Sequence, residues 1–116
     1  MAEHREVTVT PDRYVTYRYA GASGDFNPIH LDDEFARSVG LPGKILHGLW
    51  TMAQVARASS DDPLALKSLS VQFRGLGVPE KEVTITSKPR GDGEFDTEAV
   101  QDGNKLVRRG KAVLRI

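Results

Sequence analysis

In the second half of the chain, apolar residues occupy every second position over several short stretches. Alternation of this kind is typical of strands that bury one face and expose the other. Asp102-Gly103, between two of these stretches, favours a tight hairpin. With a shorter stretch near the N-terminus, the pattern predicts strands at residues 6–10, 69–73, 83–86 (ending before Pro89), 94–100 and 106–116.

The first half of the chain has helical spacing instead. Its best helix covers residues 47–58, where apolar residues lie three or four positions apart. Trp50 and Val55 lie to the side of this stripe, so the helix is apolar around much of its circumference and is expected to be largely buried. The stripe consists of Leu49, Met52, Ala53 and Ala56.

Two shorter helical segments precede this helix. One is predicted to run to Ala20, with Thr10 as N-cap and Pro11 at the first helical position. The other is predicted at residues 32–40, with acidic residues in its first turn and Gly40 as its C-terminal stop. Residues 21–30, between them, are expected to form a loop because glycine and Asn27-Pro28 interrupt any regular pattern.

This order of elements predicts an α+β fold in a single domain, residues 1–116, with one antiparallel sheet wrapped around one apolar helix. One sheet covers only one side of such a helix. We therefore expect a second copy of the chain, or a homologous partner, to cover the other side and form a dimer.

Composition excludes several classes of function. The 116 residues include 16 basic and 16 acidic side chains, so there is no positive surplus for binding nucleic acid. The chain contains no cysteine, which rules out disulfides, thiolate metal sites and thiol nucleophiles. No apolar run is long enough for a membrane span, and the expected location is cytoplasmic.

The stretch Ser23-Gly-Asp-Phe-Asn-Pro-Ile-His30 carries groups that a simple loop does not need. A turn at Asn27-Pro28 can bring Asp25 and His30 toward one point. A carboxylate and an imidazole that share one water form an acid–base pair, because histidine titrates near neutral pH.

The start of the apolar helix offers a complementary group. The first backbone N–H groups of a helix, here those of Gly48 and Leu49, have no partner within the helix and lie at the positive end of its dipole. Glycine also lets a ligand approach the backbone closely. Such a terminus can stabilise a negatively charged carbonyl oxygen.

Each of these residues also has a simpler interpretation. Asp25 can cap a turn or the following helix, and a single histidine such as His30 is more often structural than catalytic. For His47 we favour a hydrogen-bonding role at the helix N-terminus over catalysis. From spacing alone, chemistry at this loop is the less common outcome.

Residues 19–36, 45–52 and 71–79 together resemble the MaoC-like dehydratases, the (R)-specific enoyl thioester hydratases with a hot dog fold. The match is particularly close to mycolic-acid type β-hydroxyacyl-ACP dehydratase subunits. The resemblance implies reversible addition of water to trans-2-enoyl thioesters without a metal or other cofactor, with CoA or acyl carrier protein (ACP) as the acyl carrier. It further implies Asp25 and His30 as the catalytic pair, Ser23 and Asn27 as their support, and the Gly48 amide as donor to the thioester oxygen.

Substrate contacts are predicted less sharply. Leu49 is expected at the substrate, and four cations are candidates for binding the carrier's phosphates: Lys44, Arg57, Lys67 and Arg74. The expected assembly is a homodimer, or a heterodimer with a related hot dog subunit.

Two alternative functions stay open. The chain could be a silent subunit that shapes the pocket of a heterodimer, although the presence of both Asp25 and His30 argues against silence. It could also be an acyl-thioester-binding module or thioesterase. Thioesterases of this fold usually place an acid on the central helix, and residues 49–58 contain neither Asp nor Glu.

Overall fold

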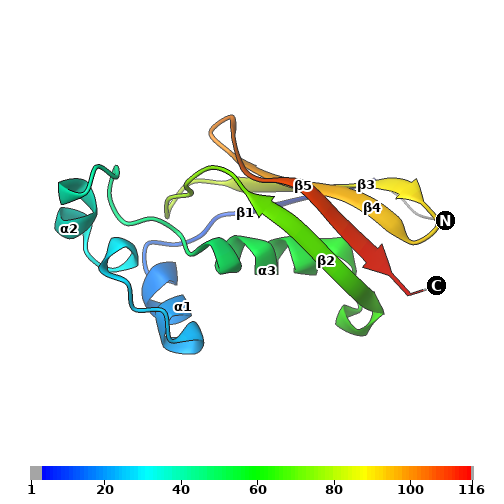
Figure 1. The fold of residues 1–116 in the computed structure, drawn as a ribbon, viewed down its shortest axis with the longest axis horizontal. Coiled ribbons are helices and arrows are strands. Elements are labelled where there is room, and N and C mark those ends of the chain that lie inside the picture. The colour runs from blue at the N-terminus through cyan, green and yellow to red at the C-terminus, as the bar shows by residue number, and fades with distance from the viewer. Residues whose placement is uncertain (1–3, 116) are drawn as a thin grey trace.

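The computed structural model describes residues 4–115 and contains a five-stranded antiparallel sheet that curves over one long helix (Figure 1). This helix, α3 (Gly48–Ser59), lies against one face of the sheet and contacts all five strands. The strand order is β1-β3-β4-β5-β2. The strands are β1 (Arg5–Val9), β2 (Leu66–Phe73), β3 (Val83–Gly91), β4 (Glu94–Gln101) and β5 (Asn104–Leu114).

The remaining helical elements lie outside the sheet. Three of them gather beyond the N-terminal end of α3, and the fourth leads from α3 into β2 (Figure 1). They are α1 (Val15–Ser23), the 3-10 turn η1 (Pro28–His30), α2 (Asp33–Ser38) and the 3-10 turn η2 (Pro63–Ala65). One helix enclosed by an antiparallel sheet is the α+β arrangement that the sequence predicted.

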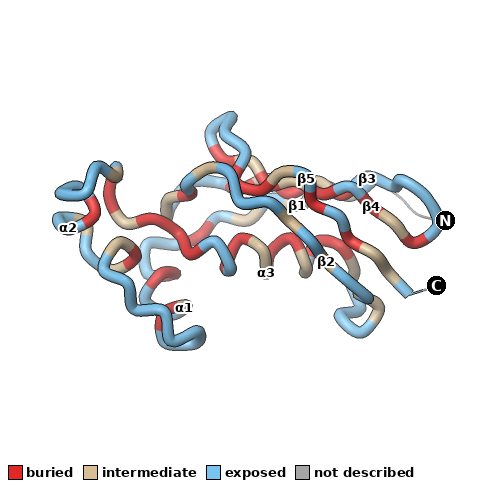
Figure 2. The backbone as a smooth tube through the Cα atoms, in the orientation of Figure 1, coloured by how far each residue is buried: buried red, intermediate tan, exposed pale blue. Residues whose placement is uncertain are grey.

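The core lies between α3 and the sheet, where buried segments of the helix and of β3 to β5 face each other (Figure 2). Trp50 and Val55 face this core, with Ile85 and Val107 from the sheet. The stripe that begins at Leu49 lies on the other side of the helix, and Leu49 is 58% exposed in the single chain. This agrees with the expectation that one sheet covers only one side of the helix. The buried face of α3 consists of Trp50, Thr51, Gln54, Val55, Ala58 and Ser59.

The start of α1 differs from its prediction. The helix begins at Val15, not at Pro11, and the Asp12 carboxylate accepts the Tyr14 N–H (2.8 Å) just before it. Pro11 is buried, and its carbonyl accepts the Glu80 N–H at 2.6 Å. This tertiary contact gives Pro11 a different role from helix initiation.

The other ends of the first two helices follow turn chemistry. α1 extends to Ser23, so Gly21 is helical rather than part of the loop, and Gly24 ends the helix with φ 79°. In α2 the side chain of Asp32 accepts the N–H groups of Glu34 and Phe35. Asp32 is thus the N-cap of the predicted helix and not part of its first turn.

The sheet matches its prediction closely, with one extension. Asp102 and Gly103 adopt φ 51° and 75° and form the expected hairpin. β3 runs through Pro89 instead of ending before it, and Pro89 pairs with Phe95 of β4. The described pairing of β1 with β3 reaches only Ser87. Within residues 4–115 no strand pairs with this side of β3 at Pro89, and a proline there costs no ladder hydrogen bond in the described sheet.

Within residues 4–115 the longest helix, α3, has 12 residues, and none of the helices is long and apolar enough to cross a membrane.

Candidate active site

The loop between α1 and η1 is shaped by a relay of short-range hydrogen bonds. The Ser23 hydroxyl accepts the Asp25 N–H, the Asp25 carboxylate accepts the Asn27 N–H, and the Asn27 side chain accepts the Ile29 N–H, each at 3.2 Å. Each bond spans two residues and bends the backbone there. Ser23 and Asn27 therefore set the course of the loop that carries Asp25. The interpretation that Asp25 caps a turn is correct for Oδ1, which accepts the Asn27 N–H. Oδ2 is not used in this turn.

His30 is buried at the end of this loop, and its ring is oriented by a backbone carbonyl. Its Nδ1 lies 2.8 Å from the carbonyl oxygen of Ile45, and the Ile45 N–H donates back to the Ile29 carbonyl at 3.1 Å. A carbonyl can only accept a hydrogen bond, so Nδ1 carries the proton of the neutral ring. Nε2 is then the basic nitrogen.

The free Nε2 of His30 lies 3.8 Å from the Asp25 carboxylate oxygen Oδ2. This distance is too long for a direct hydrogen bond and short enough for one water to contact both atoms. The His30 side chain is 9% exposed and that of Asp25 is 53% exposed, so the pair lies at the rim of the protein surface. The structure brings together the two residues that the loop sequence singled out.

The N-terminal end of α3 lies beside this pair. Within residues 4–115, no backbone or side-chain group accepts a hydrogen bond from the N–H of Gly48 or Leu49. His30 and Gly48 line one pocket of about 160 Å³. The His30 imidazole and a helix-terminal residue whose amide is unpaired in the described chain thus line the same small volume.

The rest of that pocket is mostly apolar. The ring of Phe73 lies against Gly48 so closely that a Cβ added to the glycine would be 3.2 Å from the ring. Phe73 and the pocket floor could not be predicted from the sequence near the loop, because they come from strands and loops distant in the chain. The other lining residues are Ile45, Leu46, Thr51, Gly75, Leu76, Gly77 and Leu106.

His47 is buried between two other rings. Its ring stacks on His30, with centroids 3.8 Å apart and planes at 17°, and Tyr19 lies against it with centroids 4.9 Å apart. Although His47 is the N-cap residue of α3, its side chain makes no capping bond. Instead its Nε2 lies 3.0 Å from the Asp25 carbonyl oxygen. The prediction of a hydrogen-bonding role is thus confirmed, but its partner is the Asp25 loop and not the helix.

Asp25, His30 and His47 also form the one group whose donor atoms lie close enough, within 4.8 Å of one another, to be considered as a metal site in the described chain. An imidazole donates along its ring plane, and the two histidine planes are stacked nearly parallel. Their lone pairs therefore do not converge on one point, as tetrahedral coordination requires. This geometry favours acid–base chemistry over metal binding.

Two of the four predicted phosphate-binding cations lie far from the pocket. Arg57 is nine residues beyond Gly48, about 14 Å along α3, and its guanidinium bonds Gln54 (3.2 Å). Lys67 is exposed near the start of β2, six residues or about 20 Å before Phe73. Arg74 is exposed and directly precedes Gly75 of the pocket.

Lys44 is nearer to the pocket but is already paired. Its ammonium lies 3.0 Å from the Tyr17 hydroxyl and 3.7 Å from the Asp33 carboxylate. The hydrogen bond to Tyr17 is the main cause that raises the pKa of Lys44. The Lys44 backbone N–H, which donates to the Asp33 carboxylate, is the main cause that lowers the pKa of Asp33. These contacts tie α1 and α2 to the segment that carries Ile45.

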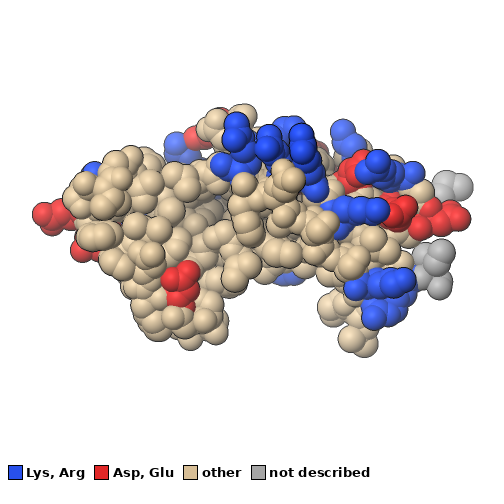
Figure 3. Space-filling view, in the orientation of Figure 1, with Lys and Arg blue, Asp and Glu red and all other residues tan. Residues whose placement is uncertain are grey.

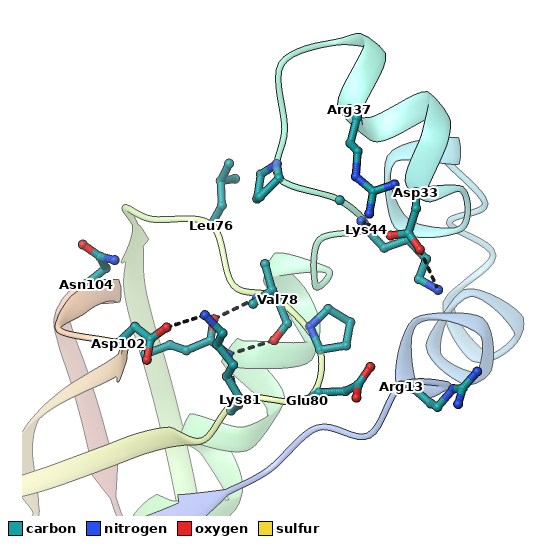
Figure 4. Close-up of a pocket in the computed structure, with 14 residues that line it drawn as sticks. Arg13, Asp33, Arg37, Lys44, Leu76, Val78, Glu80, Lys81, Asp102 and Asn104 are labelled. Carbon is teal, nitrogen blue, oxygen red and sulfur yellow. Dashed lines mark hydrogen bonds and ion pairs between the residues drawn. The ribbon is translucent and has the colours of Figure 1, made fainter.

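A larger groove of about 540 Å³ lies next to the pocket and shares Leu76 with it (Figure 4). Its charges are mixed. Lys81 pairs with Asp102 at 2.7 Å, and Arg37 lies beside the Asp33 carboxylate. Arg13 also lines the groove. Because the groove carries both positive and negative side chains, its charge does not indicate whether a ligand there would be an anion or a cation.

Comparison with known proteins assigns the chain to a family. The sequence model described as "MaoC like domain" matches residues 1–110. The chain is 32% identical over 115 residues to "Enoyl-CoA hydratase 2, peroxisomal" of Arabidopsis thaliana. The aligned region covers 95% of this chain and 36% of the relative. It is 34% identical over 82 residues to "Enoyl-CoA hydratase ChsH3" of Mycobacterium tuberculosis. This aligned region covers 66% of this chain and 28% of the relative.

Solved structures give the same fold. A MaoC-like dehydratase from Phytophthora capsici superposes with a TM-score of 0.88 at 29% identity, covering 95% of this chain and 39% of that one. The (R)-hydratase from A. caviae superposes with a TM-score of 0.85 over 98% of this chain and 94% of that one, but at 22% identity this likeness shows the fold alone. The predicted hot dog fold is confirmed, and the match over residues 1–110 shows that the chain belongs to the MaoC-like domain family.

Proposed function

We propose that this protein adds water reversibly to trans-2-enoyl thioesters and yields (R)-3-hydroxyacyl thioesters. One observation carries the proposal: Asp25 Oδ2 and His30 Nε2 are 3.8 Å apart, and His30 shares its pocket with the unpaired amide end of α3. The relatives named as enoyl-CoA hydratases support the reaction type. The (R) configuration rests on the family resemblance and on the printed name of the A. caviae neighbour.

In the proposed reaction the acid–base pair acts on one water. As the water oxygen bonds to C3, the pair takes a proton from the water, and the electrons of the C2–C3 double bond shift toward the thioester oxygen. The pair then returns a proton to C2, so that the product has gained one complete water. Proton transfer by a positioned side chain typically contributes 10²–10⁴-fold to the rate.

The N-terminus of α3 is assigned to the negative charge that develops on the thioester oxygen. The Gly48 N–H has no hydrogen-bond partner among the described residues, and it lies at the positive end of the helix dipole. A preorganised amide of this kind stabilises charge formed only along the reaction path, so it accelerates the chemical step. Because Phe73 packs against Gly48, the thioester has an apolar wall at this point.

CoA or ACP is proposed as the carrier of the acyl group. Of the four predicted phosphate contacts, Arg74 is the best placed, because it adjoins Gly75 at the pocket. Lys44 is held by Tyr17 and Asp33. The roles of Arg57, Lys67 and Leu49, like the cytoplasmic location, stay predictions from the sequence.

A dimer is proposed because large apolar side chains are exposed at the pocket and at the adjoining first turn of α3. Leu49, Phe73 and Leu76 are 58%, 52% and 55% exposed. The face of the molecule over α1 and the start of α3 carries few Lys or Arg side chains, whereas these gather over the sheet (Figure 3). A second copy, or a related hot dog subunit, would cover this surface. Sedimentation velocity at micromolar concentration should give a dimer, and a monomer would contradict this part of the proposal.

The reaction is tested with crotonyl-CoA and crotonyl-ACP by the loss of enoyl absorbance. Asp25→Asn and His30→Ala should each lower kcat by about 10²–10⁴-fold. Asp61→Asn is the matched control, since Asp61 is an exposed aspartate near the opposite end of α3 that pairs with Arg5 (2.8 Å). No hydration of either thioester by wild type, or equal rates for wild type, Asp25→Asn and His30→Ala, would contradict the proposal.

A further inference from the structure

The loop that carries the acid–base pair and the segment that opens α3 are joined by two reciprocal histidine bonds. His30, from the loop, bonds the carbonyl of Ile45 (2.8 Å), just before α3. His47, the N-cap of α3, bonds the carbonyl of Asp25 (3.0 Å) in the loop. Each segment thus contributes one imidazole and one backbone carbonyl that bonds the imidazole of the other segment.

The two rings of this exchange also pack on each other. The imidazoles of His30 and His47 stack with centroids 3.8 Å apart, and the Tyr19 ring of α1 also contacts His47, with centroids 4.9 Å apart. His47 is only 3% exposed. The plane of the His30 ring is therefore set by an aromatic neighbour as well as by its own hydrogen bond.

Among the described residues, the His47 side chain has no hydrogen-bond partner other than the Asp25 carbonyl. Its side chain makes no capping bond to α3, and its Nδ1 is buried with no hydrogen-bond partner among residues 4–115. A buried imidazole nitrogen without a partner costs free energy. Its contacts with Asp25 and His30 are thus the ones that account for its position.

We propose that His47 is a positioning residue, which holds the Asp25 backbone through Nε2–H and the His30 ring by stacking. This inference rests on the proposed hydratase function, because it assigns no chemistry to His47 itself. A displacement of about 1 Å in a catalytic group can cost about 10²-fold in rate. Loss of His47 should therefore lower kcat far more than it changes KM.

Two substitutions separate the two contacts. His47→Phe keeps a ring for stacking and loses the bond to Asp25, and His47→Gln keeps a side-chain N–H and loses the ring. We expect His47→Phe to lower kcat for crotonyl-CoA by about 10- to 100-fold, with little change in KM, and His47→Gln to recover part of that loss. A kcat for His47→Phe within about twofold of wild type would overturn the proposal.

A double-mutant cycle distinguishes positioning from a general structural role. If His47 acts through the acid–base pair, adding His47→Phe to His30→Ala should lower the remaining rate much less than His47→Phe lowers that of wild type. The same fold loss in both backgrounds would overturn the proposal, because His47 would then act independently of His30.

Wild-type protein provides a test that no folding defect can affect. Long-range ¹H–¹⁵N spectra of the histidine rings report which nitrogen carries the proton. We call the two reciprocal bonds, from His30 to Ile45 and from His47 to Asp25, the clamp. The clamp predicts the Nδ1–H form for His30 and the Nε2–H form for His47. A His47 ring with its proton on Nδ1 would overturn the clamp even if crotonyl-CoA is hydrated. Absence of hydration together with the predicted ring forms would instead contradict the proposed function and leave the clamp intact.

Discussion

The two ends of α3 differ in how their polar groups are paired. At the C-terminal end, the Ser59 hydroxyl bonds the Val55 carbonyl (2.8 Å) and Arg57 bonds Gln54. At the N-terminal end, the Gly48 N–H has no partner within residues 4–115, and His30 Nε2 lies 3.8 Å from the nearest carboxylate oxygen.

The difference indicates where a ligand is needed. Ser59 is buried and pairs its hydroxyl within the protein, as buried polar groups normally do, whereas Gly48 is exposed and its N–H is accessible to a ligand. The N-terminal end instead uses its carbonyls and histidines to orient groups that stay unpaired. Unpaired but oriented donors and acceptors around a small pocket are what a reacting molecule can bind.

Of the substitutions at the two ends of α3, the one that removes the Gly48 N–H should lower kcat the most. Gly48 is the first residue of α3, where proline is well tolerated. The preceding residue, His47, has φ −66° and ψ 134°, a conformation that proline also permits. Gly48→Pro should lower kcat by about 10²–10³-fold, as expected for loss of an oxyanion donor.

Gly48→Ala is the matched control, because it adds a Cβ next to Phe73 and keeps the N–H. Steady-state kinetics of both variants with crotonyl-CoA isolate the amide from the added carbon. Equal kcat values for the alanine and proline variants would show that the amide has no role in the reaction.

A substitution at the C-terminal end should affect stability and not activity. Ser59 is 2% exposed, and its hydroxyl has one backbone acceptor. Ser59→Ala should lower the free energy of unfolding by about 0.5–1.5 kcal/mol, measured by urea denaturation, with kcat unchanged. A loss of activity comparable to that of Gly48→Pro would remove the distinction between the two ends.

The smallest effects are expected for the distant cations. Arg57 lies about 14 Å along α3 from Gly48, and Lys67 lies near the start of β2. Arg57→Gln and Lys67→Gln should leave KM for crotonyl-CoA within about twofold of wild type, since screening weakens exposed charges beyond roughly 8–10 Å. A several-fold rise in KM would instead place the carrier's phosphates near the C-terminal end of α3. That end would then bind a ligand as well.

Much of the fold follows from local patterns in the sequence. The alternation in β2 to β5 and the Asp102-Gly103 turn are local signals, and the structure confirms them. The face of α3 that is buried could not be predicted from spacing, because the buried face carries Thr51, Gln54 and Ser59 beside Trp50 and Val55, and contact with the sheet decides which face is covered. Pro11 likewise depends on a contact with Glu80, which is distant in the chain.

The site was predictable where its groups are close in sequence. Asp25 and His30 share one loop, whose Ser23 and Asn27 side chains bond the backbone two residues on. The stacking of His47 on His30 and the packing of Phe73 on Gly48 arise only when α3 and β2 meet this loop. No pattern in the local sequence reports such contacts.

A crystal structure of Asp25→Asn bound to crotonyl-CoA would test the arrangement most directly. The account predicts the thioester oxygen about 2.7–3.1 Å from the Gly48 nitrogen, with one ordered water in contact with residue 25 and with His30 Nε2. A thioester oxygen directed away from Gly48, or a C3 atom on the side of the pocket opposite His30, would contradict it.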